Sequence, residues 1–202
     1  MAAKILMPRT EQQPPPLPDL SQRVAVLGGS NAEKSRLLVG LALRQARQHR
    51  SVLCLDGRRQ KHTEVQFRLL LRGQQSYIAL PSGTEVPRAI AQRALSSMSQ
   101  ELSTHSPLLL LDAVPETAEW EQTLAFLLKA GVGVVELLED ASRLVFGRYD
   151  TILLLRASAN EASIYSKTVG RRVEEEELET LPPGEGILLH LSRVWRVTLP
   201  EA

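Results

Sequence analysis

Short apolar runs alternate with amphipathic stretches along most of the chain. Apolar runs of about four to eight residues indicate buried strands, and a period of about 3.6 residues indicates helices. Strands are predicted at residues 23–28, 51–56, 76–80, 108–112, 132–138 and 150–156. Helices are predicted at residues 33–48, 64–72, 86–102, 117–131 and 160–170. This alternation predicts an α/β fold with a mostly parallel sheet that is covered on both faces.

The two ends of the chain differ from this pattern. Residues 1–22 are rich in proline and glutamine, which predicts an extended arm before a single domain at residues 23–202. This arm is either a loose tail or a segment that packs on a neighbouring subunit. GEGILLHL and RVWRVTLP predict a terminal β-hairpin. Further predictions are a cap at Asn160, a helix end at Gly170, and a solvated helical turn or loop for the acidic run 174–179.

The segment RVAVLGGSNAEKSRLL joins the first predicted strand to the first predicted helix. Gly28 and Gly29 follow the strand, and Lys34 and Ser35 stand at the distance that a P-loop requires. In such loops the backbone N–H groups hold phosphates, the lysine neutralises them and the hydroxyl binds Mg²⁺. The sequence therefore predicts an ATP site at these four residues, with Mg²⁺ on Ser35.

Glu33 stands where a P-loop has the glycine that precedes its lysine. A side chain here obstructs the close approach of the backbone to phosphate. A carboxylate near phosphate costs on the order of several kcal/mol if desolvated and about 1 kcal/mol if exposed. At a helix N-terminus it contributes about 0.3–1 kcal/mol of stabilisation. Two interpretations stay open: a nucleotide site, or an inherited loop that serves only as a turn.

Asp112 ends the most apolar predicted strand, in LLLLDA. NTPases hold Mg²⁺ through water with an aspartate in this place, and active ATPases commonly place a glutamate directly after it. Here position 113 is alanine, and Glu116 and Glu119 are out of register. Loss of a general base slows a reaction by roughly 10²–10⁴-fold. Binding of ATP and Mg²⁺ is therefore compatible with the sequence, whereas fast hydrolysis is not expected.

Further segments carry a family resemblance in their order and spacing. Asp56 and Gly57 follow the second strand, and LLLLDA, LLKAGVGVVELLEDASRL, YDTILLLRASANEASIYSKTVG and ELETLPPGEGILL come after them. From about residue 17 to its end, the chain resembles the HerA/FtsK superfamily of hexameric DNA-pumping ATPases. The resemblance implies a RecA/ASCE-like P-loop NTPase fold: a three-layer sandwich with a C-terminal β-hairpin. Leu138 and Glu139 replace the polar Thr-Gln sensor of that family, which is a third departure.

The same resemblance implies a ring that threads DNA, with arginine fingers supplied in trans. The candidate fingers are Arg148, Arg156, Arg171 and Arg172. Non-specific DNA contact is expected through a basic group at Arg44, Arg47, Arg50, Arg58, Arg59 and Lys61. The alternative for both sets is an ordinary solvated surface.

Composition narrows the class of protein. The chain has 202 residues, 43% hydrophobic and 23% charged, with a formal net charge of +1, so it gives no general argument for a nucleic-acid or membrane partner. The single Cys54 excludes an intramolecular disulfide. No apolar run approaches the roughly 20 residues of a membrane span. A cytoplasmic location is expected, and the four scattered histidines predict no metal other than Mg²⁺.

Three hypotheses follow. The first is a diverged ATPase related to DNA-translocating ATPases, with the ATP and Mg²⁺ site at Lys34, Ser35 and Asp112, weak or no ATP binding and little hydrolysis. The second is a catalytically inactive pseudo-ATPase that binds proteins or supports assembly, as a homo-oligomer or beside an active ATPase partner. The third is a RecA-like recombination accessory or another P-loop relative, because the order of strands and helices does not separate these branches.

Overall fold

The structure is a computed structural model that describes residues 17, 22–58, 63–65, 67, 75–80, 107–114, 117–145 and 147–201. The predicted helix at residues 86–102 lies outside the described residues, as does most of the one at 64–72. No helix among the described ranges is long and apolar enough to cross a bilayer.

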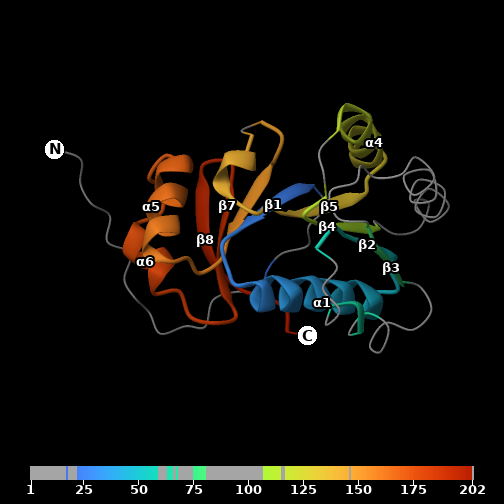
Figure 1. Ribbon diagram of the computed structural model, residues 1–202, viewed down its shortest axis with the longest axis horizontal. Helices are drawn as coiled ribbons and strands as arrows, with labels where there is room; N and C mark the ends of the chain where they lie inside the picture. Colours follow the sequence, from blue (N-terminus) through green and yellow to red (C-terminus); the bar gives the residue numbers. More distant parts are fainter. Residues whose placement is uncertain are drawn as a thin grey trace.

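An eight-stranded sheet forms the centre of the molecule, in the order β3-β2-β4-β5-β1-β6-β7-β8 (Figure 1). Its strands are β1 (Arg23–Leu27), β2 (Val52–Asp56), β3 (Gln75–Ala79), β4 (Leu108–Asp112), β5 (Gly133–Leu137), β6 (Thr151–Leu154), β7 (Glu185–His190) and β8 (Arg193–Thr198). The first six strands of that order are parallel to one another. β7 and β8 are antiparallel additions. The predicted mostly parallel sheet with a C-terminal hairpin is confirmed.

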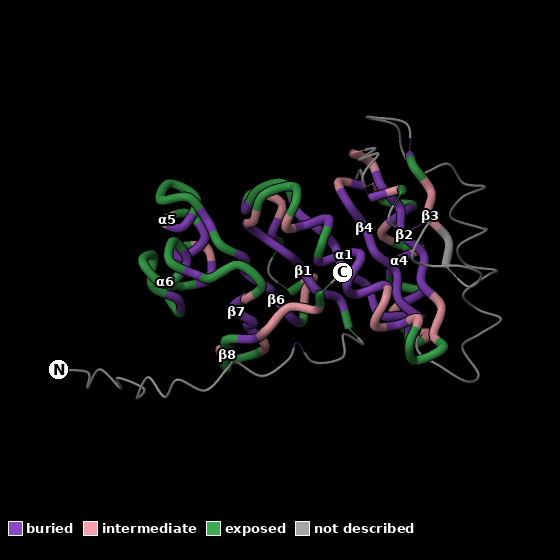
Figure 2. Tube along the Cα trace, turned by 90° about the horizontal axis from the view of Figure 1, so that it is seen from below, coloured by how far each residue is buried: buried purple, intermediate pink, exposed green. Residues whose placement is uncertain are grey.

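Helices cover both faces of the sheet, so the predicted three layers are present. α1 (Asn31–Arg47) lies on one face. α4 (Ala118–Lys129), α5 (Ala159–Thr168) and the short α6 (Glu175–Glu179) lie on the other. A 3₁₀ turn, η1 (Ala141–Arg143), follows β5. The central strands are buried on both sides (Figure 2), as near-continuous apolar runs require.

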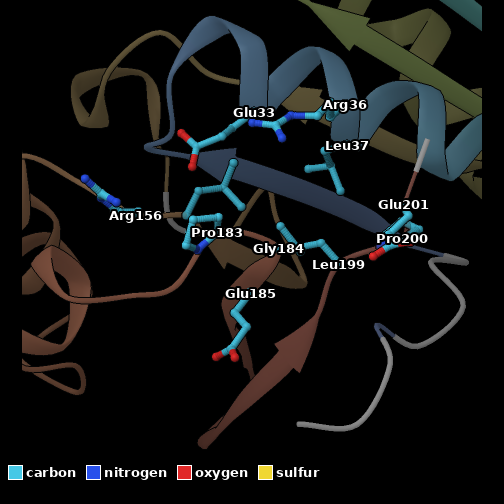
Figure 3. Close-up of a pocket in the computed structure, with 11 residues that line it drawn as sticks. Glu33, Arg36, Leu37, Arg156, Pro183, Gly184, Glu185, Leu199, Pro200 and Glu201 are labelled. Carbon is cyan, nitrogen blue, oxygen red and sulfur yellow. The ribbon is translucent and has the colours of Figure 1, made fainter. Parts of the chain in front are cut away.

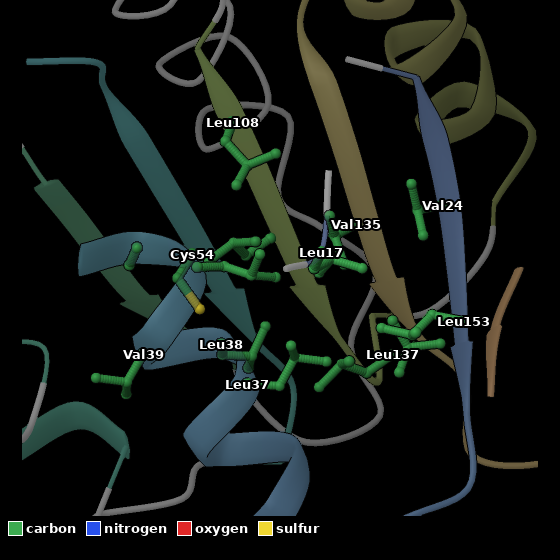
Figure 4. Close-up of a cluster of buried hydrophobic side chains, with 14 of the residues drawn as sticks. Leu17, Val24, Leu37, Leu38, Val39, Cys54, Leu108, Val135, Leu137 and Leu153 are labelled. Atoms are coloured by element: carbon green, nitrogen blue, oxygen red, sulfur yellow. The ribbon is translucent and has the colours of Figure 1, made fainter. Parts of the chain in front are cut away.

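The core under α1 is built from alternate residues of the strands. Figure 4 shows Leu37 and Leu38 of α1 facing Val135 and Leu137 of β5. Cys54 is buried in the same cluster. Burial of a leucine side chain stabilises a fold by about 1.5–3 kcal/mol. Packing against the sheet therefore fixes the position of α1, and with it Lys34 and Ser35 at its N-terminal end.

One residue of the N-terminal arm packs on its own chain. The Leu17 backbone N–H donates to the carbonyl oxygen of Thr198 at 2.9 Å, and its side chain is buried in the core under α1. Arg44 of α1 donates to the Leu17 carbonyl oxygen at 2.5 Å. The arm is thus held at this residue by both β8 and α1.

The ends of the helices differ in part from the predictions. α1 begins at Asn31, two residues before the predicted start. The predicted cap at Asn160 of α5 is wrong: Ser158 is the N-cap, because its backbone N–H donates to the Glu161 carboxylate at 3.0 Å. Gly170, with φ +71°, follows the end of α5 as predicted. The acidic run forms the helix α6, whose glutamates are exposed while Leu178 is buried.

A buried charged group joins β1, β5 and α4. The guanidinium of Arg23 lies 2.8 Å from the Glu121 carboxylate and 2.9 Å from that of Glu136. Tyr149 donates to Glu136 at 2.8 Å, and its ring lies 4.9 Å from the Arg23 guanidinium carbon. Since Arg23 and Glu136 are only 4% exposed, their charges depend on each other for compensation.

Candidate nucleotide site

Parallel strands bring the predicted site residues to one edge of the sheet. β1, β4 and β5 run in the same direction, so Gly28 after β1, Asp112 at the end of β4 and Leu138 after β5 lie at the same edge. The carboxyl edge of an open α/β sheet is where such folds bind ligands. Lys34 and Ser35 join this edge from the N-terminal part of α1 and are both buried.

Gly28 is required by the turn that leaves β1. Its φ is +80°, and a Cβ at this position would lie 2.7 Å from the carbonyl oxygen of Leu155. Both the backbone conformation and the lack of space therefore favour glycine. Gly29 continues the turn, and its N–H donates to the Arg156 carbonyl oxygen at 2.7 Å.

Several N–H groups of the loop donate within the chain. The Ser30 N–H donates to the Glu33 carboxylate at 2.7 Å, and the Glu33 N–H donates to the Ser30 hydroxyl oxygen at 3.2 Å. The Lys34 N–H donates to the Ser30 carbonyl oxygen at 3.0 Å. This reciprocal pattern is a capping box. A phosphate loop directs such N–H groups at phosphate, so the Glu33 carboxylate takes the place of an anion at the N-terminus of α1.

The Lys34 side chain is directed to the end of β5. Its Nζ donates to the Leu138 carbonyl oxygen at 3.1 Å. Burial lowers the pKa of Lys34, and the positive charge of Arg58 lowers it further. Lys34 and Arg58 are therefore close enough to repel each other.

The hydroxyl predicted to bind Mg²⁺ has a partner from another segment. Thr63 donates to the Ser35 hydroxyl oxygen at 2.9 Å, and both residues are buried. Thr63 was not identified from the sequence.

Asp112 is paired with an arginine. The Arg58 Nε lies 2.8 Å from the Asp112 Oδ1. Neither atom has a well-aligned hydrogen bond in the described part of the chain, so the contact is an ion pair. Arg58 also donates from Nη1 to the Asn31 side-chain oxygen at 2.6 Å. The guanidinium thus bridges the start of α1 and the end of β4.

Two features of the β2 end direct Arg58 to Asp112. Asp56 and Asp112 are direct partners in the register of β2 and β4. The Asp56 carboxylate accepts hydrogen bonds from the Arg58 N–H, at 2.7 Å, and from the Tyr77 hydroxyl. A Cβ on Gly57 would lie 2.3 Å from the Ala113 carbonyl oxygen, so only glycine allows the chain to pass over the end of β4 here.

Burial raises the pKa of Asp112 to about 6, an effect that Arg58 opposes and the Asp56 charge reinforces. Desolvation favours the neutral form of a carboxyl group, whereas a nearby cation favours the ionised form. The positive charge of Arg58 therefore compensates the negative charge of the Asp112 carboxylate, whose side chain is only 1% exposed.

The positions expected to hold a catalytic base and sensor carry neither. Ala113 has φ +50°, a conformation that costs an alanine about 1–2 kcal/mol. The Leu138 side chain is buried, and only its carbonyl oxygen reaches Lys34. Glu139 is exposed and pairs with Arg143 at 3.8 Å. Glu119 is exposed on α4, and Glu116 lies outside the described residues.

The described members of the predicted basic group differ in their surroundings. Arg44 contacts Leu17, Arg58 contacts Asp112, and Arg47 is exposed. Arg50 lies beyond α1 and is half-buried, while Arg59 and Lys61 lie outside the described residues.

The candidate fingers also differ in their surroundings. Arg148 lies 3.8 Å from Glu121, and Arg172 donates to the Val169 and Leu191 carbonyl oxygens. Arg156 and Arg171 are exposed.

A pocket of about 350 Å³ lies beside the start of α1 (Figure 3). Its charged lining consists of Arg36, Arg156, Glu33, Glu185 and Glu201. Three carboxylates against two guanidiniums do not favour a phosphate here.

Two features of the site were missed in the sequence. The capping box has a signature, a serine followed three residues later by a glutamate before an apolar run, and Ser30 with Glu33 fits it. The Arg58–Asp112 pair has no signature within one segment. The feature of the sequence that could have indicated this pair is that two predicted strands, at 51–56 and 108–112, each end on an aspartate.

Mg²⁺ does not fit the described residues as they are arranged. Its two predicted protein ligands are Ser35, which accepts from Thr63, and Asp112, which pairs with Arg58. Mg²⁺ requires oxygen ligands in near-octahedral geometry, and a guanidinium at Asp112 opposes a second cation there. A triphosphate held by the loop would have to displace the Glu33 carboxylate from the Ser30 N–H.

No protein-family model matches the chain, and no curated protein matches its sequence. Solved structures do match. The DNA-packaging ATPase B204 from Sulfolobus turreted icosahedral virus has TM-score 0.65 at 12% identity, over 88% of this chain and 97% of that one. The genome packaging NTPase B204 from Sulfolobus turreted icosahedral virus 2, solved with AMPPCP, has TM-score 0.60 at 13% identity, over 89% and 98%.

VirB4 of Thermoanaerobacter pseudethanolicus has TM-score 0.60 at 10% identity, over 90% of this chain and 89% of that one. At such identities the likeness establishes the fold alone. It agrees with the P-loop NTPase fold that the order of the motifs implies. The chain has the fold of the P-loop ATPases of viral genome packaging and of VirB4.

Proposed function

We propose that this chain is a P-loop ATPase relative that does not hydrolyse ATP and acts as a protein-binding or assembly subunit. The observation that carries the proposal is the Arg58–Asp112 ion pair. Metal-dependent phosphoryl transfer needs a divalent cation between Asp112 and the phosphates, and a guanidinium already lies against that carboxylate.

The loop gives independent support. Glu33 accepts from the Ser30 N–H within a capping box, an interaction that stabilises the start of α1. An exposed cap of this kind contributes about 0.5–2 kcal/mol. Binding of a triphosphate in the loop would have to break it and place phosphate beside a carboxylate. The loop is therefore suited to a structural role.

The partner in this proposal is a second copy of the chain or an active ATPase, in the cytoplasm. Retention of Lys34, Ser35 and Asp112 is the one feature that favours the alternative, a diverged ATPase acting on DNA. That alternative requires Arg58 to leave Asp112 and Glu33 to leave Ser30. The RecA-like accessory role has no observation of its own in its favour.

A turnover assay tests the proposal. Release of phosphate from MgATP is measured with the full chain, with and without double-stranded DNA, beside Lys34→Ala as the control for contaminating ATPases. We expect equal rates for the two proteins. Turnover by the wild type on the order of 1 s⁻¹ or faster that is lost in Lys34→Ala would contradict the proposal.

A further inference from the structure

Arg58 meets the requirements of an internal replacement for a metal ion. It lies 2.8 Å from the carboxylate predicted to hold Mg²⁺, and its side chain is only 15% exposed. It reaches α1 as well, through the hydrogen bond to Asn31. A permanently charged group in this position provides charge compensation that does not depend on the supply of metal.

The guanidinium is fixed from more than one side. Gly57 lets the chain cross the end of β4, and its N–H donates to the Asp112 carbonyl oxygen at 2.8 Å. Asp56 holds the Arg58 backbone N–H at 2.7 Å, and Tyr77 in turn holds Asp56. Arg58 is therefore part of a built arrangement and not an arginine that happens to reach Asp112.

Part of this arrangement lacks a partner. The Arg58 Nη2 is buried and has no hydrogen-bond acceptor among the described residues. Buried donors without partners are rare in native proteins and call for an explanation such as an absent ligand. The neighbouring cation, Lys34, has one acceptor among the described residues, the Leu138 carbonyl oxygen, although an ammonium group can donate three hydrogen bonds.

We propose that Arg58 replaces the divalent cation at Asp112, so that a phosphate-bearing ligand of this site is bound as a metal-free anion by Arg58 and Lys34. With Nε at Asp112 and Nη1 at Asn31, the Arg58 Nη2 remains to donate to a phosphate oxygen, and Lys34 adds a point charge. Binding through these side chains does not need the N–H groups that Glu33 and Ser30 engage. The inference rests on the proposed function, since it assigns a ligand to a site that performs no hydrolysis.

Two measurements on the full chain test the proposal. The first is binding of Mn²⁺, a paramagnetic substitute for Mg²⁺, by electron paramagnetic resonance. The wild type is expected to bind no Mn²⁺ at the site, Arg58→Ala to gain one bound ion, and Arg58→Ala/Asp112→Asn to lose it again. Mn²⁺ binding by the wild type that Asp112→Asn abolishes would overturn the replacement.

The second measurement is calorimetric titration with inorganic tripolyphosphate in EDTA and in excess Mg²⁺. We expect wild-type binding in EDTA, and a loss of roughly tenfold or more in affinity in both Arg58→Ala and Lys34→Met. Lys129→Ala, which removes an exposed lysine at the end of α4, is the matched control and should bind like the wild type. Absence of wild-type binding in EDTA, or binding only with Mg²⁺, would overturn the proposal.

Arg58→Ala leaves Asp112 buried without its cation, and this variant is prone to unfold. Arg58→Lys keeps the charge without the branched guanidinium that reaches Asp112, Asn31 and the ligand together, and Arg58→Ala/Asp112→Asn removes both charges. If only these fold, Arg58→Lys should weaken metal-free binding and the double variant should abolish it. Unchanged affinity in both would refute the role of Arg58. Failure of the proposed function is detected by a separate measurement, the release of phosphate from MgATP by the wild type.

Discussion

The Glu33 carboxylate accepts a hydrogen bond at 2.7 Å from the Ser30 N–H, in the loop where P-loop proteins bind phosphate. Glu33, which replaces the glycine of the motif, therefore also occupies a backbone N–H group of the loop. The same substitution that removes a phosphate-binding glycine supplies a helix cap.

Glu33→Gly is expected to strengthen phosphate binding and weaken the helix. The Ser30 N–H becomes free, and a negative charge leaves the N-terminus of α1. The affinity for tripolyphosphate in EDTA should rise by roughly tenfold, equivalent to about 1.4 kcal/mol. The free energy of unfolding should fall by about 1 kcal/mol, as measured by urea denaturation.

Glu33→Gln is the matched control. Its amide oxygen can still accept from Ser30, so the helix should keep most of its stability while the charge is removed. An affinity in Glu33→Gly equal to that of the wild type would show that Glu33 does not close the loop.

Asp112 should make stability depend on pH. Its pKa of about 6 lies above the ordinary value of 3.8, so the folded chain binds this proton more tightly than the unfolded chain. The contribution is full below about pH 4 and is lost as the pH rises through about 6. Relative to Asp112→Asn, the wild type should gain up to about 1.4 kcal/mol per pH unit as the pH falls through this window.

Urea unfolding at several pH values measures this effect. Asp140→Asn is the control, because hydrogen bonds from Ser142 lower the pKa of Asp140 and its titration falls below that window. Stability curves for the wild type and Asp112→Asn that stay parallel between pH 4 and pH 6 would exclude the predicted shift.

Arg23 should be among the most sensitive positions for stability. Arg23→Met leaves Glu136 buried without a cation, which should lower the free energy of unfolding by about 3–5 kcal/mol. Arg143→Met removes an exposed pair with Glu139 and should cost less than about 1 kcal/mol. Chemical denaturation compares the two, and equal costs would mean that the buried group is not stabilising.

The architecture was readable from the sequence because its signals are local. The continuous apolar run at 108–112 predicts a strand that is buried on both faces. The leucines of α1 recur at helical spacing, which predicts a helix with one buried face. The Ser158 cap was missed because the apolar pattern of α5 starts later than its hydrogen bonds.

The state of the site was not readable in the same way. Lys34, Ser35 and Asp112 lie at the predicted edge, yet their partners come from segments far apart in the chain: Leu138, Thr63 and Arg58. Side-chain pairing between separate strands leaves no periodic signal. The sequence predicts Arg58 within a basic surface, whereas in the structure Arg58 pairs with Asp112.

Binding of a fluorescent ATP analogue to the wild type, with Mg²⁺ and with EDTA, tests the central claim most directly. The account predicts that Mg²⁺ does not tighten binding, because Asp112 is paired with Arg58 and Ser35 with Thr63. Binding that requires Mg²⁺ and is lost in both Lys34→Ala and Asp112→Asn would contradict the account and identify a working metal-dependent nucleotide site.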